Sequence, residues 1–529
     1  MNEKAMAHSP ESKYCFALDK NTVRLRLRIS RDDRPEKVDV VYGGKYEFAL
    51  KQNRLTAVRV CEDALFAYYT ATLKLKDRRL VYVFEISDKG KTYYYSEDGL
   101  TGNYDFSLSF YNCFQYAYIN DCDIHRGADW MKSAVFYQIF VDRFNIGDGK
   151  KDKSYINLKW GEKPTPKSFA GGDLKGICDK LDYISSLGAN TIYLTPVFTS
   201  VSNHKYDIAD YFEIDRQFGD KDDLKNLVEG AHKRGMKVVL DAVFNHCSEN
   251  LKQFRDVLKN GRKSKYYNWF VINGDSPLEY ECFASCKYMP KFNTSNREVR
   301  DYLISVATYW IKEFDIDGWR LDVSDEVSHG FWRDMRRAVK EIKEDCVLIG
   351  ENWHDANVYL KGDQFDSIMN YAFTKACLDF YAFGTLSAQG FADRLNGILM
   401  RNTDTVNSMM LNLLDSHDTH RFLTQTGGDI SKLLSALCVM FFFTGAPCIY
   451  YGTENAMEGG YDPDCRRTFD WNEEGRENTV KSLIKKLSEL KKNPSFASAE
   501  VKIYAQDGQL IIERDNYKLT VGNESFAID

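Results

Sequence analysis

From residue 130 onward, short apolar runs rich in β-forming residues alternate with longer segments of helical periodicity. Segments such as 173–188, 222–235 and 296–314 carry apolar residues at three- and four-residue spacing, and several begin with Asp or Asn, which cap helices. Eight such strand-then-helix units are the number that closes a (β/α)8 barrel, so we predict an α/β fold of the TIM-barrel type. The predicted strands cover residues 135–140, 189–197, 237–244, 318–323, 347–350, 367–371, 409–414 and 446–451.

The first 125 residues follow a different pattern, in which short β-prone runs are separated by turn signals. The run 23–29 alternates apolar and cationic residues strictly, which is typical of a half-buried strand. All eight tryptophans lie at or after Trp130, so tyrosine and phenylalanine must supply the large aromatic side chains here. We predict an N-terminal β-sandwich for this part of the chain.

Two further segments interrupt or follow the barrel pattern. About 50 residues separate the third predicted strand from its helix, a length that indicates a functional loop or a small inserted domain. Three β-like runs close the chain after a final helix at 479–492 and predict a short C-terminal β domain. The predicted domains are 1–125 (N-terminal β-sandwich), 126–246 with 296–492 (barrel), 247–295 (insertion) and 493–529 (C-terminal β domain).

Composition excludes several classes of partner. Lysine and arginine number 71 against 77 acidic residues, a net charge of −6 with both signs spread along the chain, so we expect neither nucleic acid nor a membrane surface as partner. The 13 scattered cysteines favour buried free thiols in a reducing compartment over disulfides. We see no signal sequence and no apolar stretch long enough to span a bilayer. These features together predict a cytoplasmic protein.

The carboxyl ends of barrel strands are where catalytic groups project, and three of the predicted ends carry carboxylates. Asp322, Glu351 and Asp418 follow the fourth, fifth and seventh strands, with Arg320 two residues before Asp322. Glycoside hydrolysis needs such a set: one carboxylate attacks the anomeric carbon, and a protonated one assists the leaving oxygen. We expect Arg320 to lower the pKa of Asp322, and Glu351 to stay protonated. One carboxylate at a strand end more often caps or pairs, but three together favour catalysis. Two histidines, His246 and His417, lie at the same ends.

The residues around these ends resemble the four motif regions of the α-amylase superfamily, glycoside hydrolase family 13. The matching segments are DAVFNH, GWRLDV, GENW and SHDT, in the family's order. Further segments resemble its neopullulanase, cyclomaltodextrinase and maltogenic amylase subgroup, which also carries an N-terminal β-sandwich. Those segments are VFYQIFVDRF, FAGGDLKGICDKLDYI, SNHKYDIADYFEIDRQFG, MPKFNT and YDPDCRR.

The resemblance implies a role for each matching residue. Asp322 would be the nucleophile, Glu351 the general acid and base, and Asp418 the residue that stabilises the transition state. Tyr206 would stack beneath the sugar at the cleavage site, and Glu326 would lie on the acceptor side. Phe283 and Trp353 would stack across the cleaved bond, and the remaining sugar-binding residues would be His246, Arg320, His417, Asp462 and Arg466.

A purely structural role remains the alternative for several of these positions. Tyr206 could be an ordinary surface aromatic, Phe283 part of the core of the insertion, and Trp353 packing at the top of the barrel. Asp241 and Asn245 are more often structural than catalytic, and His204 is expected to orient its neighbours rather than to react.

Members of the subgroup often hold calcium in the loop after the first barrel strand. Here Asp148, Asp152 and Asp173 are the candidate ligands, whereas calcium takes six or more oxygens. Ile146 and Lys151 stand where further ligands would be expected. We therefore expect no required cofactor, with calcium at these three aspartates as the alternative.

The function implied by the resemblance is a retaining hydrolase of α-1,4 and some α-1,6 glucosidic bonds in maltodextrins, cyclodextrins or pullulan, with transglycosylation as a side reaction. The resemblance further implies a homodimer joined through the N-terminal module. The alternatives are an oligo-1,6-glucosidase or other member of family 13, and a non-catalytic glycan-binding relative. Intact Asp322, Glu351 and Asp418 argue against the last.

Overall fold

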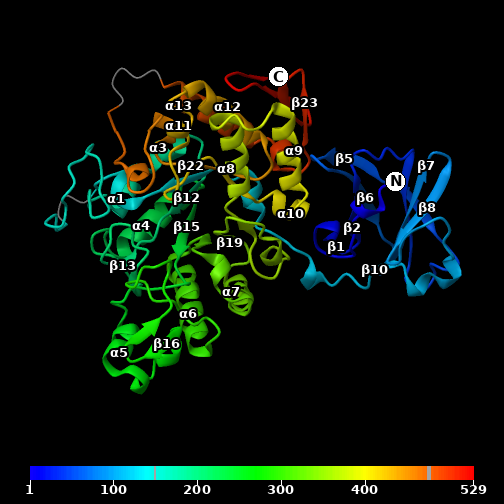
Figure 1. Cartoon of the computed structure of the whole chain (residues 1–529). Coiled ribbons are helices and arrows are strands. Elements are labelled where there is room, and N and C mark those ends of the chain that lie inside the picture. The colour runs from blue at the N-terminus through cyan, green and yellow to red at the C-terminus, as the bar shows by residue number, and fades with distance from the viewer. Residues whose placement is uncertain (148–150, 473–477) are drawn as a thin grey trace.

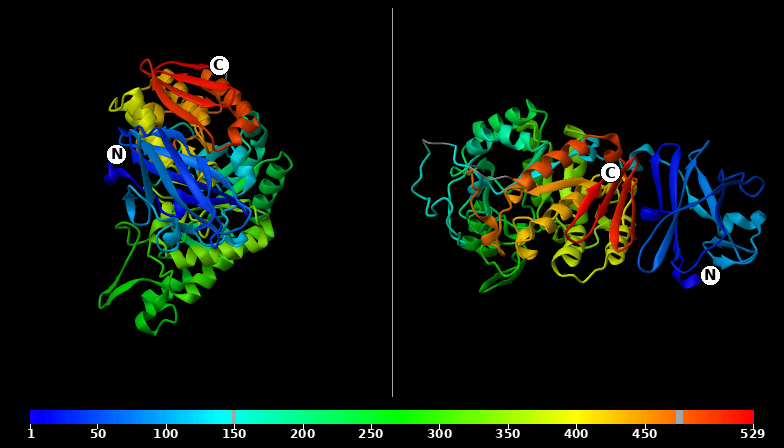
Figure 2. Two further views of the ribbon diagram at one scale, coloured as in Figure 1. Left: turned by 90° about the vertical axis from the view of Figure 1, so that its right-hand side faces the viewer. Right: turned by 90° about the horizontal axis from the view of Figure 1, so that it is seen from above.

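The computed structural model describes residues 1–147, 151–472 and 478–529. A central barrel carries the N-terminal module on one side, as Figure 1 shows, with the inserted segment and the C-terminal strands at opposite ends of the view. Two further views in Figure 2 show the N-terminal module projecting from the barrel. The fold class expected from the sequence is thereby confirmed, including both smaller β modules.

The barrel is an eight-stranded parallel sheet with the order β20-β19-β18-β15-β12-β11-β22-β21. Each strand lies within one of the eight predicted runs, and its side chains are almost entirely buried. The bounds are β11 (Phe136–Ile139), β12 (Thr191–Leu194), β15 (Lys237–Ala242), β18 (Gly318–Leu321), β19 (Val347–Gly350), β20 (Ser367–Ile368), β21 (Leu411–Leu413) and β22 (Ala446–Tyr450).

Helices surround this sheet and begin at the side-chain caps that the sequence supplies. Asp220 forms a capping box with Asp223 at the start of α4, and the Asn296 side chain accepts the first amides of α6. The longer helices are α2 (Leu174–Asp179), α3 (Leu181–Ser186), α4 (Lys221–His232), α6 (Arg297–Phe314), α7 (His329–Ile342), α8 (Tyr371–Cys377), α9 (Ala388–Leu399), α12 (Ile430–Phe442) and α13 (Thr479–Lys491). Shorter ones are α1 (Val141–Phe144), α10 (Asp404–Asn407), α11 (Phe422–Gln425) and α14 (Pro494–Ala497).

The barrel closes between β20 and β21 with little backbone pairing. Met369 and Leu411 form one isolated bridge there. Side chains supply additional links, because Ser367 Oγ donates to the Met409 carbonyl at 2.7 Å and Asn370 Nδ2 donates to Asn412 Oδ1 at 2.8 Å. This seam lies directly before α8, which contributes to the wall of the cavity described below.

The N-terminal module consists of two antiparallel sheets with the orders β1-β2-β6-β5 and β4-β3-β7-β8-β9, and β10 pairs with β7. Its core uses tyrosine and phenylalanine, including Tyr82, Phe84 and Phe114, as the absence of tryptophan required. The strands are β1 (Cys15–Asp19), β2 (Thr22–Ser30), β3 (Lys37–Gly43), β4 (Asn53–Thr56), β5 (Val58–Glu62), β6 (Phe66–Lys74), β7 (Leu80–Asp88), β8 (Lys91–Ser96), β9 (Gly99–Thr101) and β10 (Phe114–Tyr116).

Two of the three arginines on the cationic side of β2, Arg24 and Arg26, contact Asp404 of the barrel. Val23, Leu25, Leu27 and Ile29 fill the module's core as predicted. Arg26 is also buried, and its guanidinium donates to the Asn402 carbonyl at 3.1 Å and to Asp404 Oδ1 at 3.2 Å. The predicted alternation holds at Arg24 and Arg28, which are partly exposed, and fails at Arg26, which is buried because it contacts the barrel.

The insertion follows β15 and contains α5 (Lys252–Asn260) and a hairpin of β16 (Ile272–Asp275) and β17 (Leu278–Tyr280). A second hairpin, β13 (Phe198–Ser200) with β14 (Ile208–Ile214), follows β12. The C-terminal sheet has four antiparallel strands, one more than the three predicted: β23 (Lys502–Gln506), β24 (Gln509–Arg514), β25 (Tyr517–Val521) and β26 (Phe526–Ile528). Over the three described stretches of chain, the helices are all too short or too polar to cross a bilayer.

Candidate active site

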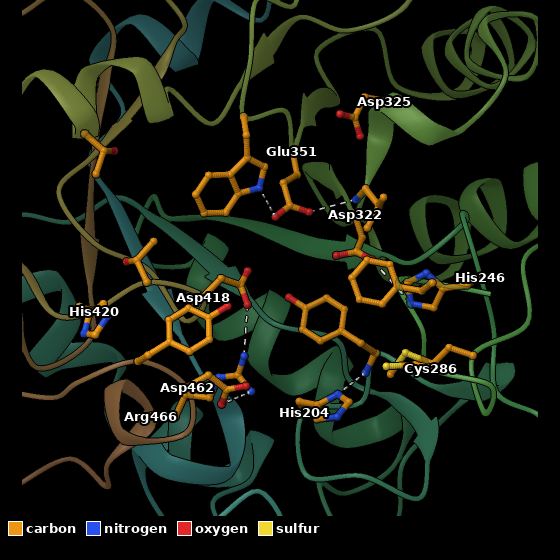
Figure 3. A pocket seen from close by; sticks show the side chains of 18 of the residues that line it. His204, His246, Cys286, Asp322, Asp325, Glu351, Asp418, His420, Asp462 and Arg466 are labelled. Atoms are coloured by element: carbon orange, nitrogen blue, oxygen red, sulfur yellow. Dashed lines mark hydrogen bonds and ion pairs between the residues drawn. The ribbon is translucent and has the colours of Figure 1, made fainter.

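A cavity of about 770 Å³ opens at the carboxyl ends of the barrel strands (Figure 3). The three carboxylates singled out in the sequence, Asp322, Glu351 and Asp418, all line it. They leave the barrel just after β18 and β19 and in the loop after β21, so strands far apart in sequence bring them together. Other predicted residues on its wall are His204, Tyr206, His246, Phe283, Trp353, Asp462 and Arg466.

Arg320 does not line the cavity but joins two of these carboxylates from a fully buried position. Its Nη1 donates to Asp322 Oδ1 at 2.8 Å, and its Nη2 lies 2.9 Å from Glu351 Oε2. The same Nη1 contacts both oxygens of Asp241 at 3.1 Å. One buried guanidinium therefore fixes the relative positions of the two groups expected to react.

The residue after Asp322 has an unusual backbone conformation. Val323 adopts φ of 43°, in the left-handed region that β-branched residues rarely occupy. In this conformation its amide donates to Glu351 Oε2 at 3.0 Å. The turn that ends β18 thus directs a backbone donor at the carboxylate of the next strand, an arrangement typical of strain at functional sites.

Burial raises the pKa of Asp322 above the ordinary aspartate value, and the charges of Glu351 and Asp241 act in the same direction. The Arg320 ion pair works against this shift but does not reverse it. The expectation that Arg320 sets a lowered pKa was therefore wrong for the net direction, because three buried carboxylates share one guanidinium.

Asp418 is held ionised by two basic neighbours. Its carboxylate lies 3.0 Å from His417 Nε2 and 3.2 Å from Arg466 Nη2. Burial alone would raise the pKa of Asp418, but the charges of His417 and Arg466 outweigh burial and hold that pKa well below its usual value. Arg466 also pairs with Asp462 at 2.9 Å, so the expected pair lies beside the third carboxylate.

Tyr206 lines the cavity, and His417 lies buried beside it, outside the lining residues. Their rings are parallel, with centroids 5.5 Å apart and planes at 3°. The Tyr206 hydroxyl donates to Asp241 Oδ2 at 2.9 Å, and the Tyr206 amide donates to His204 Nδ1 at 3.1 Å. Asp241 and His204 therefore orient Tyr206, in agreement with the structural roles expected for both. Tyr206 itself lines the cavity and does not lie on the outer surface.

His246 and Phe283 form the opposite wall. Their rings stack with centroids 4.8 Å apart, which places Phe283 on the cavity rather than in the core of the insertion. Burial lowers the pKa of His246 to about 3, so its ring is neutral near pH 7. Within the described parts of the chain, His246 Nε2 has no hydrogen-bond partner, and it lies 3.9 Å from Asp322 Oδ2. This nitrogen is available to a bound hydroxyl group.

Trp353 lies over Glu351 and is 46 % exposed. Its Nε1 donates to Glu351 Oε1 at 3.3 Å. One ring face packs on Tyr371 at the start of α8. Its exposure and its place on the cavity wall leave apolar surface accessible to a ligand.

Glu326 is one predicted site residue that does not line the cavity. Its carboxylate pairs with Lys291 Nζ at 2.9 Å and is half exposed, while its neighbour Asp325 faces the cavity. Sequence reasoning missed several residues of the cavity wall that lie close in sequence to residues it found. They are Cys286, Tyr288 and Met289 after Phe283, Thr419 and His420 after Asp418, and Tyr461 before Asp462. Their closeness in sequence to predicted site residues was the signal that could have identified them.

The three candidate calcium ligands have different surroundings. Asp148 lies outside the described residues. Asp152 is exposed and accepts the amide and hydroxyl of Ser154 within its own turn. Asp173 caps α2 by accepting the Gly176 amide, and its second oxygen lies 2.6 Å from Lys151 Nζ.

Comparison with known proteins places this site in a family. The model of the alpha amylase catalytic domain matches residues 138–517, and that of the alpha amylase N-terminal ig-like domain matches residues 1–120. A cyclomaltodextrinase from Thermoanaerobacter pseudethanolicus is 44 % identical over 499 residues, which cover 93 % of this chain and 86 % of that protein.

Two further relatives extend the comparison. An intracellular maltogenic amylase from Bacillus subtilis is 41 % identical over 508 residues, covering 94 % of this chain and 86 % of the relative. Among solved structures, a cyclomaltodextrinase superposes with a TM-score of 0.93 at 38 % identity, covering 98 % of this chain and 91 % of that one.

Proposed function

Since this chain belongs to the α-amylase family of glycoside hydrolases, we propose that Asp322, Glu351 and Asp418 are the catalytic residues of a retaining α-glucan hydrolase. The observation that carries the proposal is the Arg320 guanidinium, which contacts Asp322 and Glu351 at 2.8 and 2.9 Å. Carboxylates tied to one guanidinium suit the separation of about 5–5.5 Å in retaining enzymes better than the wider spacing of inverting ones.

In the first step, the Asp322 carboxylate attacks the anomeric carbon while Glu351 gives its proton to the departing glucosidic oxygen. A covalent bond forms between Asp322 and the sugar as the glucosidic bond breaks. This division of roles requires an ionised Asp322 and a protonated Glu351 before the bond breaks. Asp418, ionised beside Arg466, accepts hydrogen bonds from sugar hydroxyls.

In the second step, Glu351 now carries a negative charge and takes a proton from an incoming water. The water oxygen attacks the anomeric carbon, the bond to Asp322 breaks, and the product retains its anomeric configuration. A sugar hydroxyl in place of water gives transglycosylation by the same route. Trp353 and Phe283, which both line the cavity, would stack on the sugars that flank the bond.

The proposed substrates are maltodextrins, cyclodextrins and pullulan, cleaved at α-1,4 and some α-1,6 bonds. The similarity to cyclomaltodextrinases over nearly the whole chain supports this choice. The test is the product profile from a cyclodextrin and from pullulan, followed by chromatography. Panose from pullulan indicates α-1,4 cleavage and maltotriose indicates α-1,6 cleavage. Release of single glucose units from isomaltose-type oligosaccharides, with no action on cyclodextrin, would instead favour an oligo-1,6-glucosidase.

We further propose a homodimer formed through the N-terminal module. Large apolar side chains are exposed on and beside β4 and β5, among them Leu50 at 92 %, Val58 at 65 % and Leu65 at 67 %. These exposed apolar side chains are the candidate contacts of the proposed interface. Sedimentation at micromolar concentration should give twice the chain mass, and replacing Leu50 and Val58 by Glu should give the monomer mass.

A cytoplasmic location is proposed on two grounds. All 13 cysteines are free thiols, eight of them buried, which suits a reducing compartment. The maltogenic amylase of Bacillus subtilis described above is named as intracellular. Fractionation of the cells that produce the protein, with immunodetection, tests the location.

A further inference from the structure

The loop after β11 and the start of α2 form a small oxygen-lined cradle. Gly147 and Gly176 allow the two backbones to touch, because a Cβ on Gly176 would lie 2.1 Å from the Asn145 carbonyl oxygen. Asp173 Oδ1 accepts the amides of Gly147 and Gly176 at 3.0 and 2.6 Å, which directs Asp173 Oδ2 into the cradle.

Lys151 occupies the centre of this cradle. Its Nζ lies 2.6 Å from the Gly171 carbonyl oxygen, 3.1 Å from the Gln217 carbonyl oxygen and 2.6 Å from Asp173 Oδ2. The side chain is only 6 % exposed and that of Asp173 only 1 %. An ammonium group has three protons, and here each finds an oxygen acceptor.

These residues do not fit a calcium ion. Calcium requires six to eight oxygen ligands at about 2.3–2.6 Å. Among the described residues, the three oxygens that converge here already hold a positive charge at their centre, and a second cation among them would be repelled by it. Members of the subgroup often hold calcium in this loop, whereas here the Lys151 side chain supplies the cation.

A second buried lysine connects the cradle to the active site. Lys205 Nζ pairs with Asp215 Oδ2 at 2.9 Å and donates to the side-chain oxygen of Gln217, whose backbone oxygen accepts from Lys151. Lys205 immediately precedes Tyr206, which lies on the cavity floor. The two ammonium groups therefore link the loop after β11 to the loop that carries Tyr206.

We propose that the Lys151 ammonium takes the structural place of a divalent cation between the loop after β11 and α2, so that this protein folds and works without calcium. Lys151 ties its own loop to the segment 171–173, through Gly171 and Asp173, and to the Gln217 backbone. The cation is covalently part of the chain, so chelation cannot remove it.

The first test measures the wild-type protein. After dialysis against a chelator, atomic emission should find far less than one calcium per chain. The melting temperature and kcat/KM on cyclodextrin should be the same in chelator and in millimolar calcium. A stoichiometric calcium that survives dialysis, or a melting temperature that falls on chelation, would overturn the proposal.

The second test compares Lys151→Met with Lys153→Met, which removes an exposed ammonium two residues away. Loss of the buried cation leaves Asp173 without its lysine partner, so Lys151→Met should lower the melting temperature by about 3 °C or more. Lys153→Met should change the melting temperature by less than about 1 °C. Equal melting temperatures of the two variants would contradict the role of Lys151. If Lys151→Met does not fold, the calcium and chelation measurements on the wild-type protein still decide the matter.

Discussion

Trp353 and Tyr371 stack face to face, with ring centroids 3.6 Å apart and planes at 4°. Trp353 comes from the loop after β19 and Tyr371 from the start of α8, so two successive barrel units support one aromatic surface. Tyr371 is buried, and Trp353 alone presents an exposed ring at the cavity mouth. The tyrosine thus positions the tryptophan rather than contacting ligand itself.

Trp353→Ala should lower kcat/KM on cyclodextrin roughly tenfold, since one stacking contact is worth about 0.5–1.5 kcal/mol and the loss also frees Glu351 Oε1. Trp353→Phe should retain much of the activity. Steady-state kinetics on cyclodextrin measures both. Trp130→Phe changes a tryptophan that packs on Phe136 at the amino end of β11 and serves as control. Equal kinetics for Trp353→Ala and Trp130→Phe would rule out stacking at Trp353.

Asp322→Asn and Glu351→Gln should each reduce kcat by roughly three orders of magnitude or more, because each removes a covalent or a proton-transfer step. A glycosyl fluoride needs no acid to leave, so Glu351→Gln should accumulate a covalent sugar adduct on the peptide that contains Asp322. Mass spectrometry after proteolysis detects the adduct. The double variant should form none. An adduct on another residue, or near-normal turnover in either single variant, would refute the assigned roles.

His8 makes the N-terminal module sensitive to acid. Burial lowers the pKa of His8 to about 4, and its ring contacts Tyr82, Phe84 and Phe114. The unfolded chain binds a proton at this histidine below about pH 6.5, whereas the folded chain does so only near pH 4, so stability falls as the pH drops through this window. Between about pH 7.5 and 5 the loss is on the order of 2 kcal/mol.

Urea unfolding of wild type and His8→Gln at both pH values measures that effect. Glutamine does not titrate, so the variant should lose about 2 kcal/mol less of its unfolding free energy over the same interval. The quantity to compare is the urea concentration at the midpoint of unfolding of the N-terminal module. An identical pH dependence in the two proteins would contradict this account, because it would show that His8 takes up its proton equally in the folded and unfolded states.

Asp404→Asn should destabilise the contact between the N-terminal module and the barrel. The Arg26 side chain is 2 % exposed, and removing its carboxylate partner leaves a buried charge uncompensated, at a cost of about 3 kcal/mol. Urea denaturation measures the loss. Asp129→Asn removes the carboxylate partner of Lys132, with Asp129 90 % exposed, and should cost less than about 0.5 kcal/mol. Similar losses in both variants would contradict this account of the interface.

The barrel was predictable because each strand is a continuous apolar run followed by a capped helix, and both signals are local. The three catalytic candidates were predictable for the same reason, since a strand end is visible in sequence. The direction of the Asp322 pKa was not, because it depends on Asp241, Glu351 and Arg320 meeting in one buried space. The combined effect of several charges on one pKa can be judged only when the fold has brought strands from different parts of the chain together.

Residues whose role depends on a partner far away in sequence were the ones missed or misread. From the sequence alone, Arg26 is expected on the solvent-exposed side of its strand. The structure instead pairs it with Asp404 of the barrel. The ion pair of Glu326 with Lys291, from the insertion, could not be foreseen from either residue alone, and the acceptor-side role of Glu326 stays a prediction. The fourth C-terminal strand, β26, is three residues long and carries too little pattern to be recognised by periodicity.

The seam between β20 and β21 makes one part of the barrel depend on particular side chains. Elsewhere in the described sheet, neighbouring strands are joined by backbone groups that every residue type except proline can provide. At the seam, Ser367 and Asn370 supplement a lone bridge, so a substitution that preserves volume and hydrophobicity can still open the cylinder there. Helix α8, which carries part of the cavity wall, begins directly after this seam, so substitutions there act next to the junction of the barrel that tolerates them least. Variant libraries of α8 that keep Asn370 and Asn412 unchanged should therefore yield more folded proteins.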